Sequence, residues 1–317
     1  MIRNKLKTII KFGITIFLIA YVVNRAGPQQ IYNQLSQVEL YLFIAAVILG
    51  IVDTAVSALR WKYLLELLDE TISFVETFYY YYLGSFFSTV LPFRAGGDLV
   101  KAAGVSKSGT QNTDAFASVF MDRFMGLAAI ALVAPCGLLL LSPELRGSLL
   151  LPILVTTSAT FVLLIIIISR RANIVISNFL SIFPSTIYQK LEKFREALET
   201  YSSYPTILII GLILSLIFQL LAILEVSLLA ASLGIQIPLY FLVAMVPILS
   251  LILFLPISIQ GFGVREVAYV VFLSSIGIPE YQAASLSILT GVHFLVNNLI
   301  GSIGLLWSPS SMSDRST

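Results

Sequence analysis

The sequence has few charged residues, one cysteine and one histidine. Asp, Glu, Lys and Arg together make up 11% of the 317 residues, whereas a soluble domain has about 25%. The single cysteine, Cys136, excludes a disulfide within the chain, and His293 alone cannot build a site of several histidine ligands. The phosphate-binding pattern G-x-x-x-x-G-K-[ST] is also missing. We therefore expect no nucleotide, metal or other cofactor and no nucleic-acid partner.

Long apolar runs take the place of charge. Hydrophobic residues make up 58% of the chain and the mean hydropathy is +0.94, and a helix that crosses a bilayer needs about 20 such residues. We predict an all-α, polytopic transmembrane bundle of about eight spans with broken helices. The predicted spans are 8–24, 39–60, 114–141, 149–169, 204–232, 239–258, 264–277 and 281–307. They form a single domain, 1–307, in two related halves of about 1–145 and 146–307, followed by a polar tail, 308–317, that we expect to be disordered.

The distribution of Lys and Arg predicts the orientation. With eight crossings both termini lie inside, and the inner segments hold nearly all the bases, while the outer loops hold Arg25 and Arg146. Such a bias marks the cytoplasmic side. It holds if the apolar segment 72–92 is re-entrant, because a full crossing there would invert every later loop. We therefore predict a multi-pass protein of the cytoplasmic membrane, with an uncleaved first span and both termini in the cytoplasm.

The basic loop 170–203 contains an amphipathic helix. Its apolar residues recur at spacings of four and three: Ile187, Leu191, Phe194, Leu198 and Tyr201. Such a helix lies on the leaflet among anionic headgroups, or it packs on the bundle as a connecting helix.

Two breaks in the apolar pattern resemble each other. Residues 91–101 read LPFRAGGDLVK and residues 255–266 read LPISIQGFGVRE. Each begins with Leu-Pro and continues with two glycines and then charged residues. These residues are Arg94, Gly96, Gly97, Asp98 and Lys101 in the first break, and Gly261, Gly263, Arg265 and Glu266 in the second. Interrupted apolar segments at matching places in two halves indicate a transporter binding site. The alternative is a pair of ordinary interfacial loops.

Four other charged residues lie within predicted spans. Asp122 and Arg123 are adjacent, so on a helix they point about 100° apart and need not pair with each other. Charges at this depth usually face the bundle interior or a cavity, although the two also fit a structural ion pair. Asp53 and Glu225 are isolated acids. They could pair with Arg123 or Arg265, carry an ion or proton, or serve as neutral packing residues.

Three further clusters favour structural roles. Arg60-Trp61-Lys62 is typical of an anchor at the inner interface. The tyrosines from Tyr79 to Tyr82 indicate an aromatic belt. His293, Asn297 and Asn298 predict hydrogen bonds between helices.

These motifs resemble one membrane-protein family. The carrying features are R-W-x-x-L-L from Arg60, G-x-F-F-x-x-x-L-P-x-x-x-G-G-D from Gly84 to Asp98, D-R-x-x-G from Asp122, and G-x-G-x-R-E from Gly261. Over essentially the whole chain, the sequence is similar to the transmembrane domain of lysylphosphatidylglycerol synthase/flippase proteins. Arg94 departs from the smaller or polar residues expected within that segment.

The resemblance implies translocation of lipids with polar headgroups, such as aminoacylated phosphatidylglycerol, hopanoids or polyprenyl-linked sugars. The chain lacks the soluble aminoacyl-transfer domain of bifunctional members, so we expect a flippase and not an enzyme. Arg123, Lys101 and Arg265 would hold an anionic headgroup, and Asp98, Asp122 and Glu266 would orient those bases or bind a cationic group. The alternatives are an intramembrane transferase or hydrolase acting on a polyprenyl phosphate, and a non-catalytic partner of a glycosyltransferase. The expected partners are a membrane lipid, a separate lipid-modifying enzyme or glycosyltransferase, and a second copy of the chain.

Overall fold

The computed structural model describes residues 2–68, 72–90, 95–107, 112–169, 185–254, 258 and 260–303, and its regular structure is entirely helical. This confirms the predicted all-α bundle. The helices are α1 (Ile2–Ala26), α2 (Pro28–Leu35), α3 (Leu40–Glu66), α4 (Phe74–Val90), α5 (Ala95–Lys107), α6 (Asn112–Leu138), α7 (Pro143–Ile168), α9 (Ser185–Ser202), α10 (Pro205–Ser232), α11 (Leu239–Phe254), α12 (Val264–Ser274) and α13 (Glu280–Ile303). The predicted disordered tail, 308–317, and the first part of the basic loop, 170–184, lie outside the described residues.

Fewer helices than the predicted eight are long enough to span a membrane. Within the described part of the chain, five qualify by length and apolar composition: α3, α6, α7, α10 and α13. A sixth is counted if α1 and α2, bent by 87° at Gly27, are taken as one span. The difference lies at 239–258 and 264–277, where α11 has 16 residues and α12 has 11. At 1.5 Å per residue these helices are about 24 Å and 17 Å long, short of the roughly 30 Å hydrocarbon layer.

Helices α4 and α5 form an antiparallel hairpin. Gly84 on α4 lies against Gly97 and Lys101 on α5, and Tyr80, one turn earlier on α4, lies against Gly104, later on α5. Helix α4 is therefore one arm of a hairpin, which is consistent with the predicted re-entrant segment 72–92. The sequence interpretation assigned the glycines and charges after residue 94 to a break at a binding site and did not predict that they form a second arm. In the structure they begin α5, which packs back along α4.

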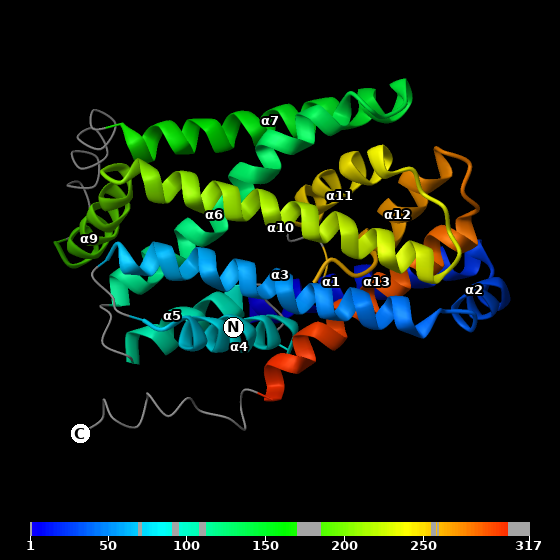
Figure 1. Cartoon of the computed structure of the whole chain (residues 1–317), viewed down its shortest axis with the longest axis horizontal. Coiled ribbons are helices and arrows are strands. Elements are labelled where there is room, and N and C mark those ends of the chain that lie inside the picture. The colour runs from blue at the N-terminus through cyan, green and yellow to red at the C-terminus, as the bar shows by residue number, and fades with distance from the viewer. Residues whose placement is uncertain are drawn as a thin grey trace.

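The order of elements in the first half recurs in the second half with inverted direction. In Figure 1, α3 and α10 run side by side, with α4, α5 and α9 at one end of the bundle and α2, α11 and α12 at the other. We call these the α9 end and the α2 end. Arg60 on α3 meets Ser215 on α10, whereas Glu39, just before α3, meets Ser232 at the end of α10, so the two helices are antiparallel. The first hairpin thus enters from the α9 end and the second, α11–α12, from the α2 end.

The two halves also exchange their first helices. Helix α1 packs on α12 and α13 of the second half, and α7 packs on α6 of the first. Helix α7 begins at Pro143, close to the boundary between halves that the sequence predicts at about 145, and that boundary stays a prediction. Each half therefore consists of a leading helix, a short helix, a long helix, a hairpin and a final long helix, and neither half buries its surfaces alone.

The two hairpins meet inside the molecule. The side-chain amide of Gln260, in the turn of the second hairpin, donates a hydrogen bond to the carbonyl of Ser88 near the end of α4. Helix α13 joins them, since the Asn298 amide donates to the Thr89 hydroxyl at 2.8 Å. The two breaks in the sequence are thus neighbours in space, as their resemblance suggested.

Helix α9 confirms the predicted amphipathic helix and packs on the bundle. The ring of Phe194 contacts Phe120 on α6, and the buried hydroxyl of Tyr201 donates to the carbonyl of Leu64 at 3.0 Å. Leu198 packs in the same apolar cluster, whereas the side chains of Ile187 and Leu191 lie outside the described residues. Contact with the bundle, which was one of the two alternatives, is therefore established for the second half of this helix.

Candidate functional site

A buried group of charges lies where the first hairpin meets the long helices. The carboxylate of Asp122 on α6, a residue only 1% exposed, accepts hydrogen bonds from Arg60 Nε at 2.8 Å, Lys101 Nζ at 3.1 Å and the Tyr81 hydroxyl at 3.3 Å. We call Arg60, Tyr81, Lys101 and Asp122 the Asp122 cluster. A carboxylate accepting several charged donors is a strong and geometrically specific arrangement.

Small residues allow Lys101 to reach this position. A Cβ atom at Gly84 would lie 2.6 Å from Cγ of Lys101, and one at Gly97 would lie 2.0 Å from the Gly84 carbonyl oxygen. The two arms therefore pack with backbones in contact. The ammonium group of Lys101 lies 3.7 Å from the ring centre of Tyr81 and 4.9 Å from that of Trp61, so aromatic faces stabilise it on the sides away from Asp122.

The Asp122 cluster joins five helices. Arg60 on α3 also donates to the Ser215 hydroxyl on α10 at 2.9 Å, while Tyr81, Lys101 and Asp122 come from α4, α5 and α6. The cluster contains two cations and one carboxylate, and their side chains are at most 6% exposed. A buried excess of positive charge is costly unless an anion balances it.

Asp98 and Arg123 form a second, more exposed pair beside this cluster. Arg123 Nη2 lies 3.0 Å from Asp98 Oδ1, with side-chain exposures of 49% and 25%. Adjacent Asp122 and Arg123 pair with other residues and not with each other, which the sequence had left open. The buried member is Asp122, whereas Arg123 turns outward and joins α6 to the first turn of α5. Gly96 is buried in that turn, and Arg94 lies outside the described residues.

The second hairpin carries its own charged pair. Arg265 Nη2 lies 2.8 Å from Glu266 Oε1, both side chains being at most 6% exposed. The other carboxylate oxygen of Glu266 accepts the backbone N–H of Gly263, and the guanidinium lies 4.7 Å from the ring centre of Phe262. Gly261 and Gly263 have φ of +83° and +84°, values that favour glycine. The Nε of Arg265 is buried and has no hydrogen-bond partner.

Arg265 is thus separate from Lys101 and Arg123. The sequence interpretation placed all three around one headgroup and put Arg265 on an inner loop. The structure places Lys101 and Arg123 with the first hairpin and Arg265 beside Gly291 of α13, where a Cβ would lie 2.3 Å from its Nη2. This difference follows from the short α11 and α12, which bring Arg265 into the interior from the α2 end.

Asp53 on α3 lies within electrostatic range of Arg60, and Glu225 on α10 lies within range of Tyr269. Neither occurs in an ion pair among the described residues, so the pairing with Arg123 or Arg265 considered for them is not observed there. Asp53 interacts electrostatically with Glu225 and with Arg60. One oxygen of each carboxylate, Asp53 Oδ1 and Glu225 Oε1, is buried without a hydrogen-bond partner.

Two residues of the Asp122 cluster were assigned other roles from the sequence. Arg60 and Trp61 were expected to anchor the chain at the interface, yet Arg60 is 5% exposed and Trp61 is fully buried, with its indole N–H donating to Ser118. Lys62 does pair at the surface, with Glu66. The expected aromatic belt is also wrong for Tyr80 and Tyr82, which are buried, and Tyr81 bonds Asp122. Aromatic and basic residues at a helix end look alike in sequence whether they face lipid or a buried acid.

The polar residues of α13 have the predicted structural role. The ring of His293 contacts the Ala46 carbonyl at 3.0 Å, and Asn298 bonds Thr89. Asn297 lies against Gly50, where a Cβ would be 2.5 Å from its amide nitrogen. These contacts hold α13 to α3 and α4 and so fix the position of α13 beside the first hairpin.

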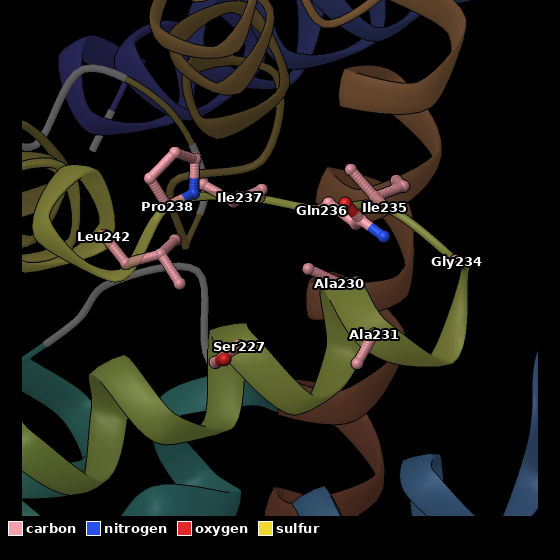
Figure 2. Close-up of a pocket in the computed structure, with 9 residues that line it drawn as sticks. All are labelled: Ser227, Ala230, Ala231, Gly234, Ile235, Gln236, Ile237, Pro238 and Leu242. Carbon is pink, nitrogen blue, oxygen red and sulfur yellow. The ribbon is translucent and has the colours of Figure 1, made fainter.

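A pocket of about 670 Å³ opens at the α2 end, between the end of α10 and the start of α11 (Figure 2). Ala230, Ile235 and Leu242 are among the residues that line it, and Ser227 and Gln236 provide its polar side chains. It contains no charged side chain and none of the residues singled out from the sequence. The charged groups of the two hairpins, rather than this pocket, are therefore the candidate site.

Comparison with known proteins agrees with this architecture. Residues 8–301 match the family described as the lysylphosphatidylglycerol synthase TM region. A UPF0104 membrane protein of Methanothermobacter thermautotrophicus is 23% identical over 98% of each chain. UPF0104 membrane protein MJ1595 of Methanocaldococcus jannaschii is 24% identical over 96% of this chain and 94% of its own. No solved structure is significantly similar. The chain therefore belongs to the lysylphosphatidylglycerol synthase transmembrane-region family.

Proposed function

We propose that this membrane protein moves a lipid with an anionic, phosphate-bearing headgroup across the cytoplasmic membrane without changing it chemically. The α9 end faces the cytoplasm in this proposal, because helix α9 lies there (Figure 1) and carries Lys193 and Arg195. The family, whose description names an enzyme of phosphatidylglycerol, supports a lipid as the substrate.

The observation that carries the proposal is the charge of the Asp122 cluster. Arg60 and Lys101 are both buried and share the single carboxylate of Asp122. One positive charge is therefore left over in a region where water is largely excluded. A phosphate entering from the α9 end would meet Arg123 first, at the exposed pair with Asp98, and then the Asp122 cluster. Arg guanidinium groups are well suited to phosphate because of their planar set of donors.

The inverted hairpins support a path through the protein. The first carries Lys101 from the α9 end and the second carries Arg265 from the α2 end, and their turns are joined by the bond from Gln260 to Ser88. In transporters with inverted repeats, broken helices at the repeat interface form the site, and access alternates as one half moves against the other. We infer that the headgroup passes between the hairpins while the acyl chains remain in the bilayer.

A reconstitution assay tests the proposal. Purified protein is placed in liposomes containing phosphatidylglycerol labelled on one acyl chain, and a membrane-impermeant quencher reports which leaflet holds the label. We expect the labelled phosphatidylglycerol to equilibrate between the two leaflets faster than phosphatidylcholine that carries the same label. Lys101→Ala and Arg123→Ala should reduce the rate at least tenfold, whereas Lys193→Ala, which removes an exposed base on α9, should not.

Two outcomes would contradict the proposal. If both Lys101→Ala and Arg123→Ala fold normally and transport at the wild-type rate, the site is wrong. If mass spectrometry shows that the recovered lipid has been altered by the protein, the alternative of an intramembrane transferase or hydrolase is correct instead.

A further inference from the structure

Two acidic residues, Asp53 and Glu225, lie within the long helices of the bundle. Asp53 and Glu225 belong to α3 and α10, which pack along each other in antiparallel directions. Asp53 Oδ1 and Glu225 Oε1 are buried and accept no hydrogen bond, although each residue keeps some accessible surface. The two acids interact electrostatically. An ionised carboxylate oxygen that accepts no hydrogen bond in the interior is strongly disfavoured.

Hydroxyl groups lie near these acids. Ser57, one turn after Asp53 on α3, is 1% exposed and its Oγ has no partner. Tyr82 on α4 is 6% exposed, and its hydroxyl interacts electrostatically with both Asp53 and Glu225. A proton on either carboxyl would supply the missing donor to an oxygen such as Ser57 Oγ. It would also remove the repulsion between two like charges.

The charged and titratable groups on the neighbouring elements leave the pair without a cation of its own. Arg60 is on α3, but its guanidinium bonds Asp122 of α6 and Ser215. Tyr269 of α12 lies within electrostatic range of Glu225. His293 of α13 is directed to the Ala46 carbonyl on α3, and Lys101 of α5 lies beyond Asp122. Among the described residues Arg60 is the cation that interacts with Asp53, and it is already bonded to Asp122. A bound proton would therefore relieve the repulsion between the two carboxylates.

We propose that the Asp53–Glu225 pair binds a proton and that this proton is coupled to the anionic headgroup at the Asp122 cluster. The coupling follows from charge. Arg60, Lys101 and Asp122 sum to one positive charge, and ionised Asp53, which interacts with Arg60, cancels it. Protonation of Asp53 restores the positive charge, so proton binding and anion binding each strengthen the other. The coupling rests on the proposed lipid transport, whereas proton binding by the pair does not.

The proton is tested first without lipid. Infrared spectra of the protein in nanodiscs are recorded as the pH is lowered through neutrality, and the C=O absorption of protonated carboxylic acids is followed. We expect a band that titrates in the wild type and that shifts or disappears in Asp53→Asn and Glu225→Gln. Glu196→Gln, which changes an exposed acid on α9, should leave it unchanged. A wild-type spectrum with no such band, or a band that persists in both variants, overturns the proposal.

The coupling is tested with short-chain phosphatidylglycerol as the probe. In weak buffer, binding to the wild type should take up one proton per lipid, and affinity should rise about tenfold for each unit by which the pH falls across the titration. Asp53→Asn, which mimics the protonated acid, should bind at every pH as tightly as the wild type does at low pH. Binding without proton uptake overturns the coupling. Failure of lipid to move in the reconstitution assay, with the infrared band intact, overturns the proposed transport but not the proton site.

Discussion

Asp122 depends on residues from helices that are far apart in sequence. Its carboxylate is compensated by Arg60, which lies 62 positions earlier, and by Lys101, which lies 21 positions earlier. Removing one member of such a buried group costs more stability than the whole group contributes, because the remaining charges stay buried without a partner. The cluster therefore stabilises the packing of α3, α5 and α6, in addition to being a candidate site for an anion.

We expect Asp122→Asn to lower the free energy of unfolding by about 3–5 kcal/mol, since it leaves Arg60 and Lys101 buried with a neutral partner. Asp98→Asn is the matched control, because its partner Arg123 is half exposed and exposed pairs contribute about 0–1 kcal/mol. Thermal and denaturant unfolding in detergent measure both. Equal losses in the two variants would show that Asp122 is not the buried centre of the group.

Sequence reasoning identified Asp122, Lys101 and both glycine pairs but missed Arg60 and Tyr81. The first set breaks the pattern of an apolar chain, so each member is conspicuous. Arg60 and Tyr81 instead fit a familiar pattern, aromatic and basic residues near a membrane interface. The sequence does hold one hint for Arg60. It follows Asp53 by seven positions, which puts both on one face of α3, but only the packing of α6 shows which acid it meets.

At the scale of elements, the first hairpin depends on backbone contact. Gly97 lies against Gly84 and Ser88 so closely that added atoms have no space. This contact sets the distance between α4 and α5, and with it the path of the Lys101 side chain.

Gly97→Ala should therefore destabilise the protein by about 1–3 kcal/mol or more, since the new Cβ would lie 2.0 Å from the Gly84 oxygen. Gly13→Ala in α1 is the control, because nothing lies within 4 Å of the new atom. Unfolding in detergent compares them. Loss of probe transport in Gly97→Ala at temperatures where it stays folded would tie the hairpin spacing to function, while wild-type stability would contradict the packing.

The contact between α9 and α3 is expected to weaken at high pH. Burial raises the pKa of Tyr201 well above its ordinary value, so the folded protein keeps a proton that the unfolded chain releases above about pH 10. Stability from this group is present below about pH 10 and falls by about 1.4 kcal/mol per unit above it. Tyr201→Phe should lose about 0.5–1.5 kcal/mol at neutral pH and lack that added slope. Unfolding curves at several alkaline pH values test this, and equal slopes would refute it.

The second hairpin shows that hydropathy alone does not predict whether an apolar segment crosses the membrane or turns back. Residues 239–258 contain enough apolar length for a crossing, and the Leu255-Pro256 break after Phe254 marks the end of α11 but does not show that the chain turns back there. Whether an apolar segment crosses or turns back is decided by what covers its polar turn. Here that cover comes from α1, where Thr15 and Leu18 lie against Gly263, and from α4 through Ser88. These contacts join residues from opposite halves of the chain and are not visible in local pattern.

At the scale of the whole molecule, one helical hairpin enters from each end of the bundle. The α9 end and the α2 end are therefore built in the same way. The inversion follows from the antiparallel packing of α3 and α10, which the sequence alone does not show. With α1 and α7 exchanged between halves, a movement of one half carries a helix packed on the other. The halves are therefore mechanically linked without being fused into one rigid core.

The opposed hairpins also have an electrical consequence. Buried charges reach inward from both ends of the bundle, at the Asp122 cluster and at Arg265 and Glu266, so the low-dielectric barrier between them is expected to be thinner than the surrounding roughly 30 Å of hydrocarbon. A transmembrane voltage falls mainly across the low-dielectric part, and is thus concentrated between the hairpin turns. A headgroup with one negative charge would cross most of that voltage in one short step, at up to about 2.3 kcal/mol per 100 mV. Imposed potassium diffusion potentials should therefore bias the leaflet distribution of labelled phosphatidylglycerol and leave that of phosphatidylcholine unaffected. The membrane potential would thus influence transport through the charge of the lipid.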